Sequence, residues 1–223
     1  MKKFIATAPL QRPKSEKTCY RAIDNLKLVY DKPVDYPVLH IINGYLEAGD
    51  EMEAIILTTD RIGKKEENIL EENEKENILS PVEENFQRME KEIQELCEKR
   101  NAICKNITRI HIPDDELIQT HLNTFQKLIS CFDNDDILYA CMTYGTKPVP
   151  IVQLMALNYA YRALNNVTIE CICYGALDHD TKEKRIFDIT ALFLMDQIVN
   201  ELAKIRDNNP VEVIRQILDV EEE

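Results

Sequence analysis

Two kinds of apolar segment alternate along this 223-residue chain, and the alternation constrains its fold more than any other feature. The run 137–142 is continuously apolar, which is typical of a central strand covered on both faces. From Pro148 the apolar residues recur at helical spacing instead, and a further strand is predicted at 167–174. Parallel strands need crossover helices of this kind, so the pattern predicts an α/β fold.

Repetition of this alternation predicts one Rossmann-like three-layer α/β/α domain with a mainly parallel sheet and right-handed connections. Earlier strands are predicted at 4–8, 54–59 and 107–112. The predicted helices span 38–46, 80–97, 117–129, 148–164 and 188–205, and a short final helix begins at Pro210. The hydrophobic content of 44% is enough to furnish the core of such a domain.

Local signals predict several helix ends and buried faces. Ser80 is placed as an N-cap, Pro81 occupies the first helical position, and Glu83 closes a capping box. Gly49 is placed to end the first helix. The helix over 117–129 should carry acidic residues in its first turn. Its buried face should consist of Leu117, Ile118, Leu122, Phe125, Leu128 and Ile129.

Composition excludes several classes of protein. The 40 acidic and 27 basic residues give a net charge of -13, which opposes binding to duplex nucleic acid because polyanions are repelled. No run of about eighteen apolar residues is present, and the apolar opening segment is too short for a signal peptide, so no membrane contact is expected. The seven cysteines form no Cys-x-x-Cys pair, which indicates reduced thiols in a cytoplasmic protein with no metal or cofactor.

Several conspicuous residues have structural interpretations. Cys171 and Cys173 share one face of a strand, and His121 falls among the apolar positions of its helix, so packing is the expected role of all three. The charged stretch 178–185 is interpreted as a hairpin or loop. Residues 61–80 are almost wholly charged or amide-bearing and are predicted to form a flexible acidic insertion.

The segment 142–148, Met-Thr-Tyr-Gly-Thr-Lys-Pro, is the most informative candidate site. It should leave the carboxyl end of a buried strand, where open parallel sheets bind their ligands. Its hydroxyls, glycine and lysine, and the helix N-terminus that follows, would each suit a phosphate group. An ordinary strand-to-helix turn with a surface lysine is the alternative. Walker and dinucleotide-binding glycine patterns, a serine nucleophile elbow and two common nuclease signatures are absent.

Three segments share a pattern with a known family: 6–11, 139–148, and 174–177 together with 186–190. They resemble the CRISPR-associated Rossmann-fold family, sensor domains that bind cyclic oligoadenylate second messengers in type III CRISPR immunity. Thr143 and Lys147 match the hydroxyl and basic positions of what looks like the family's second ligand motif, and Cys141 stands where the family usually has Asp or Asn. The resemblance would cover nearly the whole chain.

The resemblance implies a homodimer with a cyclic oligoadenylate lying across its two-fold axis. It implies a ligand-sensing domain at 1–187 and C-terminal helices at 188–223, which would serve dimerisation or relay the signal to a downstream effector domain or protein. The implied ligand-binding residues are Thr7, Ala8, Pro9, Leu10, Gln11, Met142, Thr143, Tyr144, Gly145, Thr146 and Lys147. The apolar face of the 188–205 helix fits either a dimer interface or core packing; it contains Leu192, Met195, Val199 and Leu202.

Three functions stay open on the sequence. A homodimeric sensor, with cyclic tetra-adenylate as the expected ligand, is favoured because it needs only pocket geometry. A metal-independent ring nuclease would cleave the ring by attack of a ribose 2′-hydroxyl on the adjacent phosphodiester, with Lys147 stabilising charge and Thr7 or Thr143 orienting the phosphate. An unrelated nucleotide-binding enzyme on the same architecture is the third.

Overall fold

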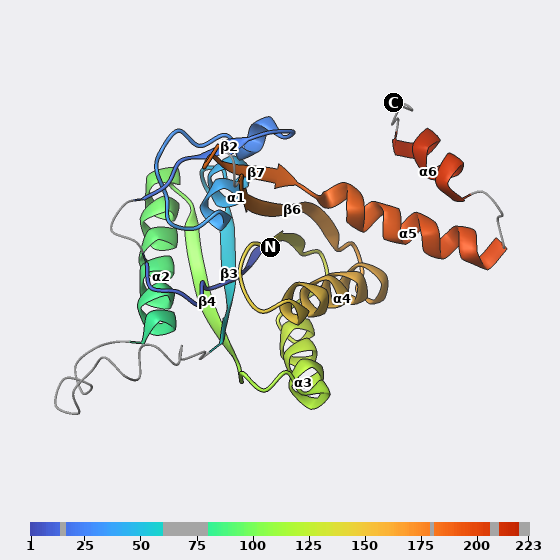
Figure 1. Ribbon diagram of the computed structural model, residues 1–223, viewed down its shortest axis with the longest axis horizontal. Helices are drawn as coiled ribbons and strands as arrows, with labels where there is room; N and C mark the ends of the chain where they lie inside the picture. Colours follow the sequence, from blue (N-terminus) through green and yellow to red (C-terminus); the bar gives the residue numbers. More distant parts are fainter. Residues whose placement is uncertain (14–16, 60–79, 179–180, 206–209, 219–223) are drawn as a thin grey trace.

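The computed structural model describes residues 1–13, 17–59, 80–178, 181–205 and 210–218 (Figure 1). The strands in this part of the chain are β1 Lys2–Thr7, β2 Tyr20–Ala22, β3 Glu51–Thr59, β4 Ile103–Ile112, β5 Ile137–Cys141, β6 Thr168–Leu177 and β7 Lys184–Asp188. The helices are the 3-10 helix η1 Leu26–Leu28, α1 Val38–Tyr45, α2 Pro81–Arg100, α3 Ile118–Ile129, α4 Pro148–Ala163, α5 Thr190–Ile205 and α6 Pro210–Leu218.

The strands form one sheet in the order β2-β7-β6-β5-β1-β3-β4. Neighbouring strands from β4 to β6 run parallel, whereas β7 is antiparallel to β6. The predicted α/β fold with a mainly parallel, Rossmann-like sheet is confirmed. The strand order reverses between β1 and β5, and the carboxyl ends of strands at such a reversal are where this architecture binds ligands.

Helices cover both faces of the sheet and make three layers (Figure 1). Side chains alternate along a strand, so Phe4 and Ala6 of β1 face α1 and α2, while Ile5 packs against α3 and α4. The continuous apolar run of β5 follows the same rule: Tyr139 joins the first core and Leu138 the second. Burial on both faces is therefore the reason for its uninterrupted hydrophobicity.

The N-terminus of α2 forms as predicted, with one difference. Ser80 Oγ accepts a hydrogen bond of 3.1 Å from the Glu83 backbone N–H, and Pro81 is the first helical residue. The Glu83 carboxylate instead contacts Gln87 and, at 2.5 Å, Arg109 of β4, so it does not close a capping box within the described contacts. The side chain of Glu83 therefore ties α2 to the sheet.

Two expectations about helix ends were wrong. Gly49 has a positive φ of 87°, but α1 ends at Tyr45 with Leu46 as its C-cap, so this glycine shapes the turn before β3 instead of ending the helix. The helix α3 begins at Ile118, and its first turn contains no acidic residue. The acids Asp114 and Asp115 lie before the helix, where Asp115 accepts a hydrogen bond from the Leu117 backbone N–H.

The predicted buried face of α3 is also only partly correct. Leu128 is fully buried, but Leu117, Ile118 and Leu122 are 59%, 74% and 53% exposed. Neighbouring elements α4 and β4 cover only the side of α3 that carries Leu128. Periodicity identifies an apolar stripe, but it does not reveal how far a neighbour covers that stripe.

Most of the predicted apolar face of α5 is exposed, so core packing does not explain it. Leu192, Met195 and Val199 are 59%, 37% and 42% exposed, and Phe193 packs into the core instead. The helix begins where expected, because Asp188 Oδ1 accepts a 2.9 Å hydrogen bond from the Thr190 backbone N–H. It then extends away from the sheet, with α6 near its far end (Figure 1).

Other expectations have mixed outcomes. The charged stretch after β6 is a hairpin leading into β7, and Cys171 and Cys173 are fully buried core residues, both as predicted. The edge strand β2 and the 3-10 helix were not predicted from the sequence. The predicted acidic insertion at 61–80 lies, apart from Ser80, outside the described residues. Within the described chain no helix has the length and hydrophobicity needed to cross a bilayer.

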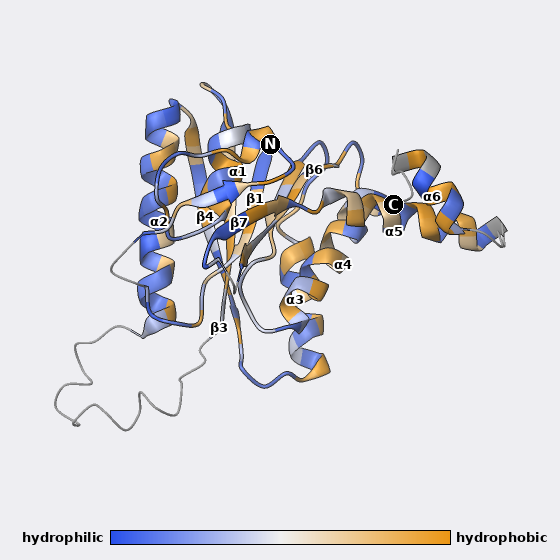
Figure 2. Cartoon of the chain, turned by 45° about the horizontal axis from the view of Figure 1, so that its top comes forward, coloured by the Kyte–Doolittle hydropathy of each residue, from blue (hydrophilic) through white to orange (hydrophobic). Residues whose placement is uncertain are grey.

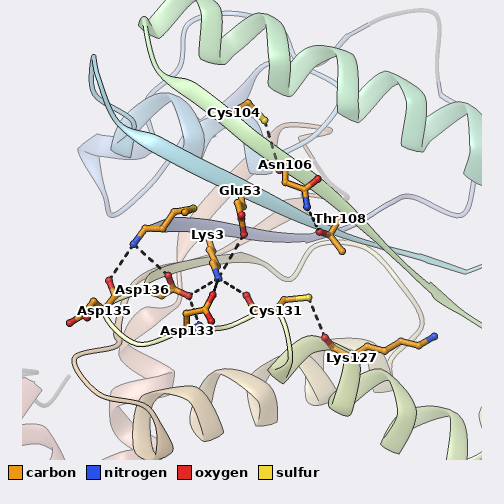
Figure 3. Close-up of polar contacts among 11 residues, drawn as sticks. Lys3, Glu53, Cys104, Asn106, Thr108, Lys127, Cys131, Asp133, Asp135 and Asp136 are labelled. Carbon is orange, nitrogen blue, oxygen red and sulfur yellow. Dashed lines mark hydrogen bonds and ion pairs between the residues drawn. The ribbon is translucent and has the colours of Figure 1, made fainter.

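A buried lysine organises the amino edge of the sheet (Figure 3). Lys3 is 2% exposed, and its ammonium donates to the Cys131 carbonyl at 2.6 Å and to Asp133 at 2.8 Å, with Asp136 Oδ2 at 2.9 Å. Burial alone would lower the pKa of Lys3, but hydrogen bonds to the two aspartates outweigh it and raise the pKa. Lys3 therefore stays charged and joins β1 to the segment before β5, at the opposite edge from the candidate site.

Candidate functional site

A cavity of about 320 Å³ opens at the carboxyl ends of β5 and β6, beside the loop that follows β1. Ligand pockets commonly range from about 300 to 1,000 Å³, so the cavity is large enough for a nucleotide-sized group. Its walls come from elements far apart in sequence. The lining residues are Pro9, Gln11, Arg12, Pro13, Thr18, Tyr20, Asp35, Tyr36, Asn85, Thr143, Tyr144, Gly175, Ala176, Leu177 and Lys184.

The loop after β1 is held by Asn85 of α2. The buried amide nitrogen of Asn85 donates to the carbonyl oxygens of Pro9 at 3.0 Å and Gln11 at 2.8 Å. Its amide oxygen accepts a 3.0 Å hydrogen bond from the Tyr36 hydroxyl. Because both ends of this side chain are bonded within the protein, Asn85 shapes the cavity and is not left to bind a ligand.

The turn after β5 is attached to β6 through Thr143. Thr143 Oγ1 accepts a 2.9 Å hydrogen bond from the Gly175 backbone N–H and lies 3.2 Å from Cys141 Sγ. Gly145 has a φ of 106°, a conformation that favours glycine. A Cβ added to Gly145 would lie 3.1 Å from Thr7 Cγ2, so the end of β1 sits directly against this turn.

The backbone N–H groups available to an anion lie in the turn after β5, and few lie in the first turn of α4. The Thr143 backbone N–H is directed at Cys141 Sγ, but among the described residues no acceptor is recorded for the backbone N–H groups of 144–147. In α4 itself Pro148 and Pro150 have no N–H, and the Val149 N–H is bonded to the Thr146 carbonyl at 3.0 Å. Consecutive unpaired N–H groups of this kind form anion-binding concavities. The donors therefore come from the turn, and the expected helix amides contribute little.

Aromatic hydroxyls form one wall of the cavity. The Tyr20 and Tyr144 hydroxyls lie 3.2 Å apart, and the Tyr144 hydroxyl donates to the Asp35 carbonyl oxygen at 3.4 Å. Lys184 Nζ lies 5.3 Å from the centre of the Tyr20 ring and donates to Thr18 at 2.8 Å. Burial raises the pKa of both Tyr20 and Tyr144, so each hydroxyl keeps its proton near neutral pH.

The residues predicted to bind ligand from the sequence divide into three groups. Pro9, Gln11, Thr143 and Tyr144 line the cavity. A second group lies beneath it: Thr7, Ala8 and Met142 are no more than 9% exposed. A third group borders it with at least partly exposed side chains: Leu10, Gly145, Thr146 and Lys147. In the described part of the chain no hydrogen-bond or ion-pair partner is recorded for the Lys147 ammonium.

Eleven of the fifteen lining residues were missed by reasoning from the sequence, among them Arg12, Tyr20, Asp35, Asn85 and Lys184. They come from segments that are separated by up to about 170 positions in the chain. No local pattern connects them. The pairing of β2 with β7 places Tyr20 opposite Lys184, the bridge between Thr18 and Val34 brings in Asp35, and α2 carries Asn85. A polar residue such as Asn85 on the apolar face of α2 was the one available signal.

The arrangement combines anion donors with a polar, aromatic-walled cavity. No group of three or more His, Cys, Asp or Glu side chains that could hold a metal ion occurs among the residues the structure describes. No protein-family model matches the sequence, and no match is found among curated proteins. The chemistry of the site is therefore the basis for assigning a function.

Proposed function

We propose that this chain is a homodimeric sensor that binds a cyclic oligoadenylate, with cyclic tetra-adenylate as the expected ring, in type III CRISPR defence in the cytoplasm. The observation that carries the proposal is the meeting of two loops, 8–13 and 143–147, beside one cavity at the switch point of the sheet. These loops belong to two of the segments that resemble the CRISPR-associated Rossmann-fold family. A ligand there would touch both.

The phosphates of the ring would bind at the 143–147 turn. Its unpaired N–H groups and the exposed Lys147 supply donors and positive charge in a protein whose net charge is -13. Local donors of this kind are needed, because the overall field repels a polyanion. The site thus supports a compact anion that fits the turn and disfavours a long nucleic acid duplex.

A base of the ring would enter the adjoining cavity. Tyr20 and Tyr144 provide aromatic surface. Gly175 lets Pro37 and Tyr20 pack closely against β6, since an added Cβ there would lie 2.9 Å from Pro37 and 3.2 Å from Tyr20. Bases bound outside a duplex stack on such aromatic side chains. A phosphate turn next to an aromatic cavity is the pattern expected for a nucleotide ligand.

An exposed apolar face supports dimerisation. Helix α4, which starts at the candidate site, has Arg162 as its one charged residue, and Ile151, Met155 and Tyr159 are 61%, 55% and 47% exposed on it. Figure 2 shows hydrophobic residues on α4 and its neighbours. A contiguous exposed apolar patch of this kind marks interaction surfaces. Two copies joined here would bring two sites near one symmetric ligand.

The ring-nuclease alternative has less support from the geometry. Thr7 is 1% exposed and its hydroxyl lies 3.4 Å from Gln153 Nε2, so it is not placed to orient a phosphate from the surface. Thr143 Oγ1 already accepts from Gly175. Lys147 would stabilise charge, but no base stands beside it among the described residues. A binding module needs none of these groups.

Titration with cyclic tetra-adenylate tests the proposal. Calorimetry of the wild-type protein should show binding of one ring per dimer, and Lys147→Ala should weaken it at least tenfold, because hydrogen bonds to charged groups contribute about 1.5–3 kcal/mol. The melting temperature should hardly change, since an exposed turn lysine contributes little to stability. Lys127→Ala, an exposed lysine on α3, is the matched control and should bind like wild type.

Product analysis after the same incubation separates the alternatives. An intact ring recovered after binding agrees with a sensor, whereas linear products ending in a 2′,3′-cyclic phosphate would identify a ring nuclease. Absence of binding to cyclic tetra- and hexa-adenylate would leave an unrelated nucleotide-binding enzyme and would overturn the proposed function.

A further inference from the structure

One acidic side chain in the cavity lacks a hydrogen-bond donor. Asp35 lines the cavity, and its side chain is 10% exposed. Its Oδ2 is buried without a hydrogen-bond partner, and no described residue is recorded as donating to either carboxylate oxygen. The nearest cation is Arg88, whose Nη1 lies 3.9 Å from Oδ2, beyond hydrogen-bond distance. A nearly buried carboxylate without a donor is costly, so this position calls for an explanation.

The usual structural explanations do not account for Asp35. It lies just before α1, but that helix has Pro37 as its N-cap and no side-chain capping bond. The donors around it are directed elsewhere: the Tyr36 hydroxyl donates to Asn85, and the Tyr144 hydroxyl reaches the backbone carbonyl of Asp35, not its carboxylate. Arg88 makes its closer contact, 2.9 Å, with Glu84. The donor for this carboxylate is therefore expected to come from a ligand.

We propose that Asp35 accepts a hydrogen bond from the exocyclic 6-amino group of adenine and thereby makes the cavity select adenine over bases with a keto oxygen at that ring position. This inference rests on the proposed function, because it assumes that the ligand is a nucleotide. An ionised carboxylate only accepts hydrogen bonds, so it favours an amino group and opposes the keto oxygen that guanine or uracil would present. The partly exposed ring of Tyr144, beside the 6% of Tyr20 that is exposed, offers aromatic surface to a base.

The charges in the cavity argue against a simple cation as the missing donor. Arg12 and Lys184 line the same space, so a free metal ion or amine would meet positive charge as well as Asp35. A neutral base with an amino group meets no such repulsion. Its attached phosphate would in turn lie near the unpaired N–H groups of 144–147.

Deletion of the amino group from the ligand tests the inference directly. Wild-type protein is titrated with cyclic tetra-adenylate and with the same ring built from purine riboside, which differs only in lacking the 6-amino groups. Wild type should bind the adenylate ring at least tenfold more tightly, a factor that corresponds to about 1.4 kcal/mol. Asp35→Ala should bring the two affinities within about threefold, and Asp35→Asn, which keeps a neutral acceptor, should give an intermediate ratio.

Controls separate this role from folding and from the proposed function itself. Asp31→Asn removes an exposed carboxylate of the same segment and should keep the wild-type ratio, and circular dichroism establishes that each variant is folded. Equal binding of both rings by wild type would overturn the role of Asp35 and leave the sensor function standing. If neither ring binds, the sensor proposal fails. The role of Asp35 is then tested by comparing the affinities of wild type for adenosine 5′-monophosphate and purine riboside 5′-monophosphate. If wild type prefers adenosine 5′-monophosphate and Asp35→Ala loses that preference, the role of Asp35 is supported. If wild type binds both monophosphates equally, that role is overturned.

Discussion

Buried and partly buried polar side chains determine the local structure around the site at the scale of single residues. Asn85 fixes the loop after β1, Thr143 joins the β5 turn to β6, and Lys3 closes the opposite edge of the sheet. His40 of α1 is a fourth example. Its Nδ1 lies 2.7 Å from the Leu28 carbonyl oxygen, and its buried Nε2 has no partner in the described structure. Each such side chain fixes its local structure more narrowly than an apolar residue would, because a buried polar group that loses its hydrogen-bond partner destabilises the fold.

The buried ring of His40 should make stability depend on pH. Burial lowers the pKa of His40, and this effect outweighs the hydrogen bond to Leu28, which raises it. The unfolded chain, whose histidine has a pKa of about 6.5, therefore binds a proton more readily than the folded protein does. The free energy of unfolding should fall as the pH drops below about 6.5.

Urea unfolding at pH 7.5 and 5.5 measures this dependence. His40→Asn, which keeps a donor near Nδ1 and does not titrate, should show a smaller loss of stability between the two pH values than wild type. His111→Asn removes an exposed histidine from β4 and should retain the full loss. An identical loss in His40→Asn and wild type would show that other groups cause the acid sensitivity.

At the scale of elements, the turn between β5 and α4 shapes the candidate site. Its glycine at position 145 adopts a positive φ and lies against Thr7, which lets the turn pack on the end of β1. Prolines at 148 and 150 start α4 but leave its first turn poor in donors. An anion bound here would therefore find its backbone donors in the turn that precedes the helix and few in the helix itself.

Substitution of Gly145 should disturb both stability and binding. Gly145→Ala places a non-glycine residue at a φ of 106° and a methyl group 3.1 Å from Thr7, so it should destabilise the protein by about 1–3 kcal/mol in urea unfolding. Gly49→Ala is a matched control, because that glycine has a φ of 87° but no atom within 4 Å of an added Cβ. It should be less destabilised and should bind cyclic tetra-adenylate like wild type. Equal effects on stability would show that only the backbone conformation matters.

At the scale of the whole molecule, charge and hydrophobicity are distributed unevenly. The chain has 30% charged residues, yet α4 has one charged residue in 16. Two molecules that each carry a net charge of -13 repel one another through most of their surface. The uncharged face of α4, continued by exposed Ile118 and Leu122 of α3, is where two copies would meet with least repulsion.

A charge placed on this face should separate the subunits. Wild type should elute with twice the chain mass of 25.9 kDa in light scattering, and Met155→Glu should elute as a monomer, because an unpaired carboxylate would be buried in the interface. Leu26→Glu changes a residue that is 90% exposed outside the face and should remain dimeric. A dimer that survives Met155→Glu would show that another surface joins the subunits.

The sequence by itself determined the fold class and the position of most elements. The continuous run that became β5, the N-cap at Ser80 and the alternating apolar segments depend on neighbours along the chain, where periodicity and local hydrogen bonding act. The turn with Thr143 and Tyr144 could be found in the same way, because the carboxyl end of a buried parallel strand is a predictable place for a ligand.

Only the tertiary structure decided which side chains share the cavity and which apolar residues stay exposed. Tyr20 and Lys184 meet because β2 pairs with β7 at the sheet edge, and the bridge between Thr18 and Val34 brings Asp35 to the same cavity; neither pairing has a local signal. Thr7 proved to lie beneath the turn, and Ile118 proved to face solvent, although both fit their sequence patterns. A pattern records which residues can be buried, whereas their burial depends on what packs against them.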